Sequence, residues 1–169
     1  SKNLLVLHGP ESQLASAIAA RKSAEALSIY NSTCELFADQ AIECVSYLIR
    51  GDGQFSTSHA ARALGFARDN HLPAVLSNAV RMLNRSDGPV ADVLDAARKL
   101  VPLSNKSVSR QNSEAYFKDS SEMSYLSDEI SRLAGERDGR LLLNTTTAWA
   151  ERALLSPRKD VGIGAIHLP

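Results

Sequence analysis

Three short apolar runs punctuate the first half of the chain, and each is bounded by polar or turn-forming residues. They lie at residues 3–9 (NLLVLHG), 41–51 (AIECVSYLIRG) and 74–80, the last within the stretch LPAVLSNAVRM of residues 72–82. Aliphatic and β-branched runs of this length, ended by glycine, proline or charged residues, are typical of buried strands. The pattern therefore predicts three strands.

The segments between and after these runs carry apolar residues at helical spacing. Helices are predicted over residues 11–22, 23–39 and 58–70, then from residue 90, from residue 119 and over residues 140–155. Ser23 suits an N-cap, and Asp119 precedes Glu122 at the spacing of a capping box. The apolar residues at helical spacing are Leu27, Tyr30, Cys34, Phe37, Ala60, Ala61, Leu64, Ala67, Val90, Val93, Leu94, Ala97, Val101, Met123, Leu126, Ile130 and Leu133.

Strands alternate with helices in the order β-α-α-β-α-β, after which only helices follow. Such alternation indicates an α/β fold with a parallel sheet or barrel. Three strands cannot close a barrel, and the chain begins at Ser1 without a methionine. We therefore interpret the chain as a fragment that lacks the first half of its fold. An α/β portion is expected over residues 1–103, and a helical extension over residues 104–169.

The composition narrows the classes of function. The chain has 169 residues, with 19 Lys+Arg and 19 Asp+Glu, so its formal net charge is zero. This balance argues against a dedicated nucleic-acid arm or a membrane-surface domain. No run approaches the roughly 18–20 apolar residues of a membrane span. Cys34 and Cys44 are typical of free thiols in a reducing cytoplasm, although a disulfide between them stays open at this point.

The carboxyl ends of parallel strands are where α/β folds carry their chemistry. The third strand ends in Ser77, Asn78 and Arg81, without a carboxylate, histidine or cysteine. His8 lies at the end of the first strand, but none of the four histidines has the spacing of a zinc site. Ser46, like Ser77, lacks the motif and the adjacent base that activate a nucleophile.

The remaining glycine-containing stretches, histidines, hydroxyls and the tryptophan are interpreted as structural residues and not as parts of a site. The glycine-containing stretches 51–54 and 160–164 lack the context of a phosphate loop and are predicted to be turns. His59 and His71 flank a helix and are expected at the surface or at the helix ends, and His167 lies in the tail. The hydroxyls of residues 144–147 are expected on a packed helix face, with contact to a strand or a phosphate as the alternative. Trp149 is expected to anchor the core.

Seven stretches, in one order along nearly the whole chain, resemble a bacterial family. They are LLVLHGPES (4–12), CVSYLIRGDG (44–53), ARDNHLPAVLSNAVRMLN (67–84), ADVLDAARKLVPL (91–103), NSEAYFKDSSEM (112–123), NTTTAWAERALL (144–155) and DVGIGAIHLP (160–169). The chain resembles the PHP (polymerase and histidinol phosphatase) region of C-family DNA polymerases, the DNA polymerase III alpha subunits. It is most similar to the actinobacterial error-prone, translesion type.

The resemblance implies the second half of a PHP-type (β/α)7-like barrel with parallel strands, followed by a mostly helical segment. In active members, cysteine, histidine and carboxylate side chains at the strand ends bind metal. Proline and alanine carry no donor atom, serine is a weak neutral ligand, and arginine repels a divalent cation. A degenerate site without metal is therefore expected. The positions that match the family's ligands are Pro10, Ser46, Arg50, Ala79 and Arg81.

By resemblance, the chain is a non-catalytic structural region, and its parent is a DNA-directed DNA polymerase with Mg²⁺ in a core outside this chain. The expected partners are the rest of the polymerase chain, DNA through the parent, a sliding clamp and translesion accessory proteins. A cytoplasmic location without membrane contact is expected.

Two alternatives remain at this point. One is an active PHP phosphoesterase or 3′–5′ exonuclease whose remaining ligands precede the chain. The other is an anion- or partner-binding module with a cleft formed by His8, Arg50, Asn78 and Arg81.

Overall fold

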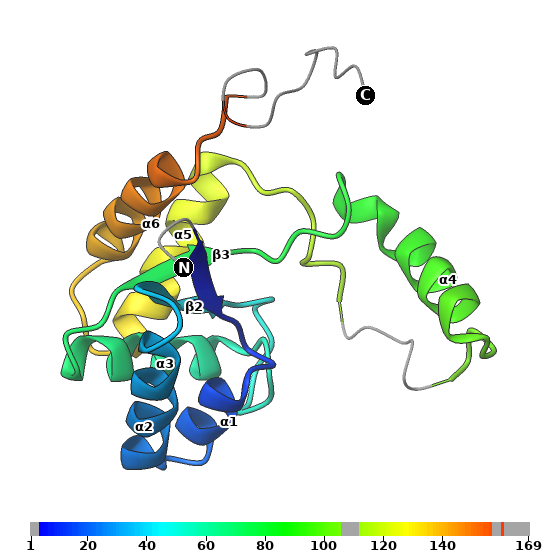
Figure 1. Ribbon diagram of the computed structural model, residues 1–169. Helices are drawn as coiled ribbons and strands as arrows, with labels where there is room; N and C mark the ends of the chain where they lie inside the picture. Colours follow the sequence, from blue (N-terminus) through cyan, green and yellow to red (C-terminus); the bar gives the residue numbers. More distant parts are fainter. Residues whose placement is uncertain (1–3, 106–111, 157–159, 161–169) are drawn as a thin grey trace, which may run out of the picture.

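The computed structural model describes residues 4–105, 112–156 and 160. Within them, three strands alternate with three helices, and three further helices follow (Figure 1). A short 3₁₀ helix, η1 (Arg85–Asp87), precedes the fourth helix. The elements are β1 (Leu5–His8), α1 (Gln13–Ala19), α2 (Ser23–Cys34), β2 (Asp39–Val45), α3 (Thr57–Asp69), β3 (Ala74–Ser77), α4 (Gly88–Lys99), α5 (Ser120–Leu133) and α6 (Arg140–Arg152).

The three strands form one parallel sheet in the order β1-β2-β3. His8 of β1 is paired with Ile42 of β2, and Cys44 of β2 is paired with Leu76 of β3. The predicted α/β class with parallel strands is therefore confirmed. Within the described residues the sheet is open and does not close into a barrel.

The main core lies on the side of the sheet that Ile42, Cys44 and Leu76 face. Side chains alternate between the faces of a strand, so paired residues of neighbouring strands point the same way. The small inward residues of α3 let this helix pack closely on β2. The prediction of that face is confirmed, since Ala60, Ala61, Leu64 and Ala67 are all buried. His59 lies in the first turn of α3, as one of the two predicted placements has it, but it is buried and not at the surface.

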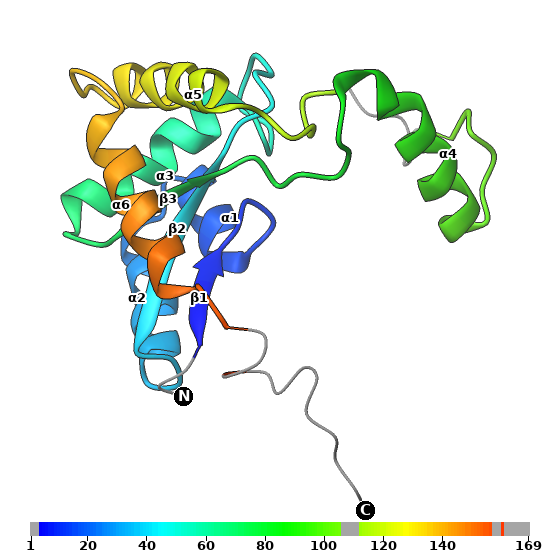
Figure 2. The same ribbon diagram turned by 90° about the horizontal axis from the view of Figure 1, so that it is seen from above.

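Helix α6 packs along the outer edge of β3 (Figure 2). The backbone N–H of Leu76 donates to the hydroxyl Oγ1 of Thr146 at 2.8 Å, which satisfies an edge donor that has no neighbouring strand among the described residues. The alternative interpretation of this hydroxyl run, contact with a strand, thus holds at Thr146. Trp149 is only half-buried, and the guanidinium of Arg152 lies 5.1 Å from its ring centroid.

Helix α5 begins at the predicted capping box. The carboxylate of Asp119 accepts from the N–H of Glu122 at 2.8 Å, and the carboxylate of Glu122 accepts from the N–H of Asp119 at 2.9 Å. Leu126 and Ile130 then enter the main core beside the sheet residues. Leu133, predicted for the same face, is exposed because it stands at the helix end.

Several sequence-based boundaries and faces are wrong. The second strand ends at Val45 instead of residue 51, and the third ends at Ser77 instead of residue 80. Positive backbone φ angles at Leu48 (55°) and Ala79 (40°) turn the chain after these strands. Ser23 is the first residue of α2 rather than its N-cap.

The two cysteines do not form a disulfide: Cys34 is exposed and Cys44 is buried, and both are free thiols. Burial raises the pKa of the Cys44 thiol to about 12. His167 and most of the stretch 160–164 lie outside the described residues. Of the helices described in residues 4–105 and 112–156, none is long and apolar enough to cross a membrane.

Candidate functional site

His8 faces the helical layer because its register partner, Ile42, does so. Its Nε2–H donates to Oε1 of Gln40 at 2.6 Å, and its ring centroid lies 5.8 Å from that of Tyr30. The same Gln40 oxygen accepts from the hydroxyl of Thr33 at 2.6 Å. The imidazole is therefore a buried member of a hydrogen-bonded cluster between β1 and α2.

Glu43, on the opposite face of β2, is a carboxylate that the sequence analysis missed. Its Oε1 accepts from the hydroxyl of Ser77 at 2.5 Å. A Cβ on Gly9 would lie 2.8 Å from Oε2 of Glu43, so the turn before the buried Pro10 closes over this carboxylate. The alternation of β2, with Ile42 and Cys44 inward, is the sequence signal that places Glu43 on the other face.

Ser46 is fully buried just after β2. Its hydroxyl is 3.0 Å from the hydroxyl of Thr57, and its Oγ accepts from the N–H of Leu48 at 3.0 Å. These bonds connect the end of β2 to the first turn of α3. The hydroxyl is committed to this junction, which is a structural arrangement rather than the setting of a nucleophile.

Asn78 attaches a later segment of the chain to the end of β3. Its Nδ2 donates to the carbonyl of Glu114 at 2.9 Å and to the carbonyl of Tyr116 at 2.6 Å. The next residue, Ala79, accepts at its carbonyl from the phenol of Tyr47 at 3.3 Å. The strand end thereby holds residues 114–116 beside β2 and β3.

Arg81 forms a two-pronged ion pair with Asp95 of α4. Its guanidinium nitrogens lie 2.7 and 3.3 Å from the two carboxylate oxygens. This hydrogen bonding lowers the pKa of Asp95, and burial opposes the shift. A free anion at this position would have to compete with a carboxylate that is already bound.

Arg50 lies in different surroundings from Arg81. Its exposed side chain lines a cavity of about 670 Å³ between the start of α3 and the face of α5, where Tyr125 and Arg132 also lie. Among the described residues, no carboxylate pairs with Arg50. The cavity's lining does not include His8, Asn78 or Arg81, so the four proposed anion-binding residues do not share it.

The sequence analysis also missed an ion cluster around the buried carboxylate of Glu114, the residue whose carbonyl accepts from Asn78. Glu114 pairs with Lys118, at 3.0 Å, and with Arg85, while the ammonium of Lys118 lies 4.1 Å from the ring centroid of Tyr116. A hydrogen bond to the carboxylate of Glu122 raises the pKa of Tyr116 to about 12. The short acidic and basic stretch 112–123 contains most of these residues, but its spacing does not distinguish a buried cluster from a solvated one.

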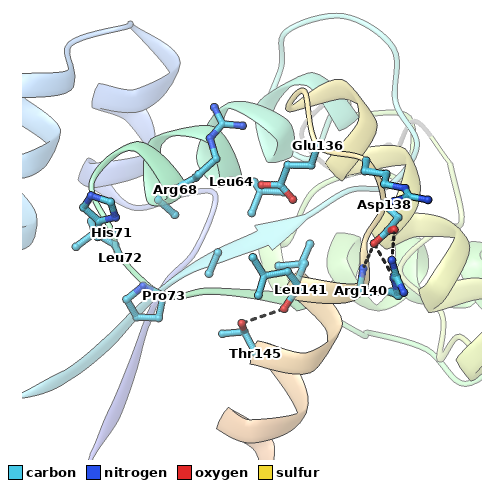
Figure 3. A pocket seen from close by; sticks show the side chains of 14 residues that line it. Leu64, Arg68, His71, Leu72, Pro73, Glu136, Asp138, Arg140, Leu141 and Thr145 are labelled. Carbon is cyan, nitrogen blue, oxygen red and sulfur yellow. Dashed lines mark hydrogen bonds and ion pairs between the residues drawn. The ribbon is translucent and has the colours of Figure 1, made fainter.

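A cavity of about 890 Å³ lies at the other end of the sheet (Figure 3). It opens between the end of α3, the start of β3 and the start of α6, far from the strand ends where chemistry was expected. An ion pair between Asp138 and Arg140, at 2.9 Å, stands at its rim. Figure 3 labels Leu64, Arg68, His71, Leu72, Pro73, Glu136, Asp138, Arg140, Leu141 and Thr145 around it.

The residues at the positions that resemble PHP ligand positions do not fit a metal. Pro10 and Ala79 offer no side-chain donor, Ser46 is hydrogen-bonded to Thr57, and Arg81 is a cation paired with Asp95. In the part of the chain that the structure describes, no group of three or more histidine, cysteine or acidic residues is arranged to hold a metal ion. No protein-family model matches the chain, and no curated protein matches it.

The Arg81–Asp95 pair predicts a specific pH dependence. Because the pKa of Asp95 is lower in the folded state, the pair stabilises the fold above the unfolded pKa and stops doing so as pH falls through the folded value. Asp95→Asn is expected to cost about 1 kcal/mol at pH 7, since Arg81 is partly exposed, and progressively less as pH falls below the ordinary aspartate pKa of 3.8. Urea unfolding of both proteins from pH 7 to about pH 2 measures this difference.

Asp52→Asn is the matched control, because its ion pair with Arg62 joins an exposed carboxylate to the same kind of cation. Its cost is expected to be smaller at pH 7. An Asp95→Asn cost that stays constant across the range would contradict the prediction.

Proposed function

We propose that this chain is a non-catalytic, PHP-like structural region of an error-prone DNA polymerase III alpha subunit. In this proposal the strands and helices described above are the second half of a PHP-type barrel. The parent protein carries out template-directed DNA synthesis in damage-tolerant replication. Its Mg²⁺ ions are bound in a polymerase core outside this chain, and DNA, a sliding clamp and translesion accessory proteins are its partners.

The observation that supports a structural role is that the polar side chains at the end of β3 bind other parts of the same chain. Asn78 donates to two carbonyls of the segment 114–116, and Arg81 binds Asp95 of α4. Both side chains therefore connect the sheet to later parts of the chain. A catalytic strand end would instead present free metal ligands or a free base. The polymerase assignment itself rests on the seven resembling stretches.

Elemental analysis and nuclease assays of the longer parent protein, purified without chelators, test this proposal. Primer extension by the parent is the expected result, with substoichiometric zinc, manganese and iron and with no 3′-end removal when the polymerase carboxylates are substituted. Stoichiometric zinc, manganese or iron with metal-dependent nuclease activity would favour the phosphoesterase alternative. A parent protein that does not extend a primer would remove the polymerase assignment.

The anion-binding alternative is tested by comparing the DNA affinity of two arginine variants. Arg50→Ala in the parent protein is expected to leave DNA affinity unchanged, and Arg62→Ala is the matched control because Arg62 is already paired with Asp52. A selective loss of DNA affinity in the Arg50 variant would support a binding role for the cavity that Arg50 lines.

A further inference from the structure

Aspartate is followed directly by glycine at three places in the chain, at residues 52–53, 87–88 and 138–139. In this dipeptide the aspartate can react with its own backbone, because glycine has no Cβ to keep the side-chain carboxyl away from the next amide nitrogen. The reaction needs a free N–H on the glycine, a carboxyl that is not held elsewhere, and room for the backbone to rotate. The structure meets these requirements at only one of the three places.

The loop before α3 leaves Asp52 and Gly53 open. The side chain of Asp52 is 82% exposed, and its contact with Arg62, at 2.9 Å, is a surface ion pair that water screens. Among the described residues, no acceptor is hydrogen-bonded to the N–H of Gly53. Apart from its chain neighbours, nothing lies within 4 Å of a Cβ built on Gly53. The amide nitrogen and the carboxyl are therefore free to meet.

The second aspartate–glycine pair, at the start of α4, is closed to the reaction. The carboxylate of Asp87 accepts from the backbone N–H of Asn84 at 2.9 Å and from its side-chain amide at 3.2 Å. The N–H of Gly88 donates to the carbonyl of Arg85, and a Cβ on Gly88 would lie 2.1 Å from Oγ of Ser113. Attack by this nitrogen would have to break the capping arrangement of the helix.

The third pair, before α6, is closed for similar reasons. The N–H of Gly139 donates to the carboxylate of Asp128 at 2.8 Å. The carboxylate of Asp138 accepts from Nη2 and Nε of Arg140 at 2.9 and 3.1 Å. Gly139 also lies against the backbone of Ser127, which leaves no room for rotation. The two closed pairs thus serve as internal comparisons for the open one.

We propose that Asp52 and Gly53 form a site of spontaneous succinimide formation and aspartate isomerisation. The amide nitrogen of Gly53 attacks the protonated side-chain carboxyl of Asp52, a C–N bond forms, and the carboxyl hydroxyl leaves as water with the proton of the nitrogen. Water then adds to either ring carbonyl and breaks one of the two ring C–N bonds. The products are aspartate or isoaspartate, in which the main chain runs through the side-chain carbon. This inference stands independently of the proposed polymerase function.

The surroundings of the loop affect the reaction and are changed by it. The guanidinium of Arg62 donates to the carbonyl of Asp52 at 3.3 Å, and this carbonyl shares its peptide group with the nitrogen of Gly53. Withdrawal of electrons from that group makes its N–H more acidic and favours attack. In isoaspartate the former backbone carbonyl becomes the free carboxylate, so both contacts of Arg62 with the loop are altered. The N–H of Ser56, the N-cap of α3, binds the carbonyl of Gly53 at 3.1 Å, so the change reaches the start of this helix.

Incubation of the folded 169-residue chain in mildly acidic buffer tests the proposal, with proteolysis and electron-transfer fragmentation to distinguish isoaspartate from aspartate. Isoaspartate is expected to accumulate at residue 52 at a rate several-fold above that at residues 87 and 138. In water enriched with heavy oxygen, each converted peptide is expected to take up one solvent oxygen. In urea the preference for residue 52 is expected to disappear, because unfolding frees all three glycine N–H groups.

A substitution at the attacking residue provides the second test. Gly53→Ala is expected to slow conversion several-fold, because the added methyl hinders attack, and the open space around it lets the variant fold. Gln54→Ala, at the next exposed position, is the matched control and should leave the rate unchanged. Circular dichroism checks that each variant folds. Equal isoaspartate at the three positions of the folded chain, a preference that persists in urea, or a Gly53→Ala variant that converts like the wild type would overturn the proposal.

Discussion

Replacing Lys118 with methionine is expected to lower the free energy of unfolding by about 3 kcal/mol, because it removes one partner of a buried ion pair. The side chains of Lys118 and Glu114 are 3% and 4% exposed, and the ammonium and a carboxylate oxygen are 3.0 Å apart. Methionine keeps most of the length and apolar character of the lysine stem. The cost therefore reports the carboxylate of Glu114 left in the interior rather than a cavity.

The remaining contact of Glu114 limits this cost. Arg85 also pairs with the Glu114 carboxylate, but its side chain is 66% exposed, so water screens part of the attraction. Arg85→Met is accordingly expected to cost only about 1 kcal/mol, since the buried lysine still neutralises the glutamate. Urea unfolding at pH 7, followed by circular dichroism, measures both variants against the wild type.

A double variant separates the ion pair from simple packing. Glu114→Gln combined with Lys118→Met removes both charges together, and its stability is expected to lie within about 1 kcal/mol of the wild type. A double variant as unstable as Lys118→Met alone would contradict the explanation. In that event the cost would arise from lost packing of the lysine against Tyr116, over whose ring the ammonium lies at 4.1 Å.

The parts of the fold that the sequence predicts well depend on nearby residues. The buried face of α3 follows from the repeat of Ala60, Leu64 and Ala67, and the start of α5 follows from Asp119 and Glu122, three positions apart. The end of β2 depends on a more distant contact, because the hydroxyl of Ser46 meets that of Thr57. Local propensity does not include that bond, which is why the predicted strand is too long.

The candidate site was less predictable for the same physical reason. The polar residues at the end of β3 are visible in the sequence, but the partners of Asn78 lie 36 and 38 residues further along. Periodicity also shows which residues of α4 share a face without showing which face is covered. Leu94 and Asp95 are adjacent, and it is the carboxylate, through Arg81, that turns inward.

Gly139, the residue that precedes α6, lies against Ser127 of α5. Its carbonyl accepts from the hydroxyl of Ser127 at 2.7 Å, and its N–H donates to the carboxylate of Asp128 at 2.8 Å. A Cβ at this position would lie 2.5 Å from the backbone carbonyl carbon of Ser127 and 2.6 Å from its Cβ. Ordinary van der Waals contacts between carbon atoms are about 3.5–4.0 Å, so the two backbones must separate.

Gly139→Ala is therefore expected to destabilise the fold by about 3 kcal/mol, at the upper end of overpacking costs, because relief of the clash also breaks the two hydrogen bonds between the helices. Gly53→Ala is the matched control: nothing lies within 4 Å of its added Cβ, and its stability is expected to change by less than about 1 kcal/mol. Chemical denaturation of both variants provides the comparison.

Truncating the neighbouring side chain tests the source of the strain. Ser127→Ala removes the hydroxyl but leaves the backbone carbon and the Cβ in place, so adding it to Gly139→Ala is expected to recover little stability. Full recovery would mean that the hydroxyl alone carries the clash and that the backbones of α5 and α6 do not need to move. Because Leu126, Ile130 and Leu142 of these two helices share the core with Ile42 and Leu76 of the sheet, separation of the helices also loosens the packing over the strands.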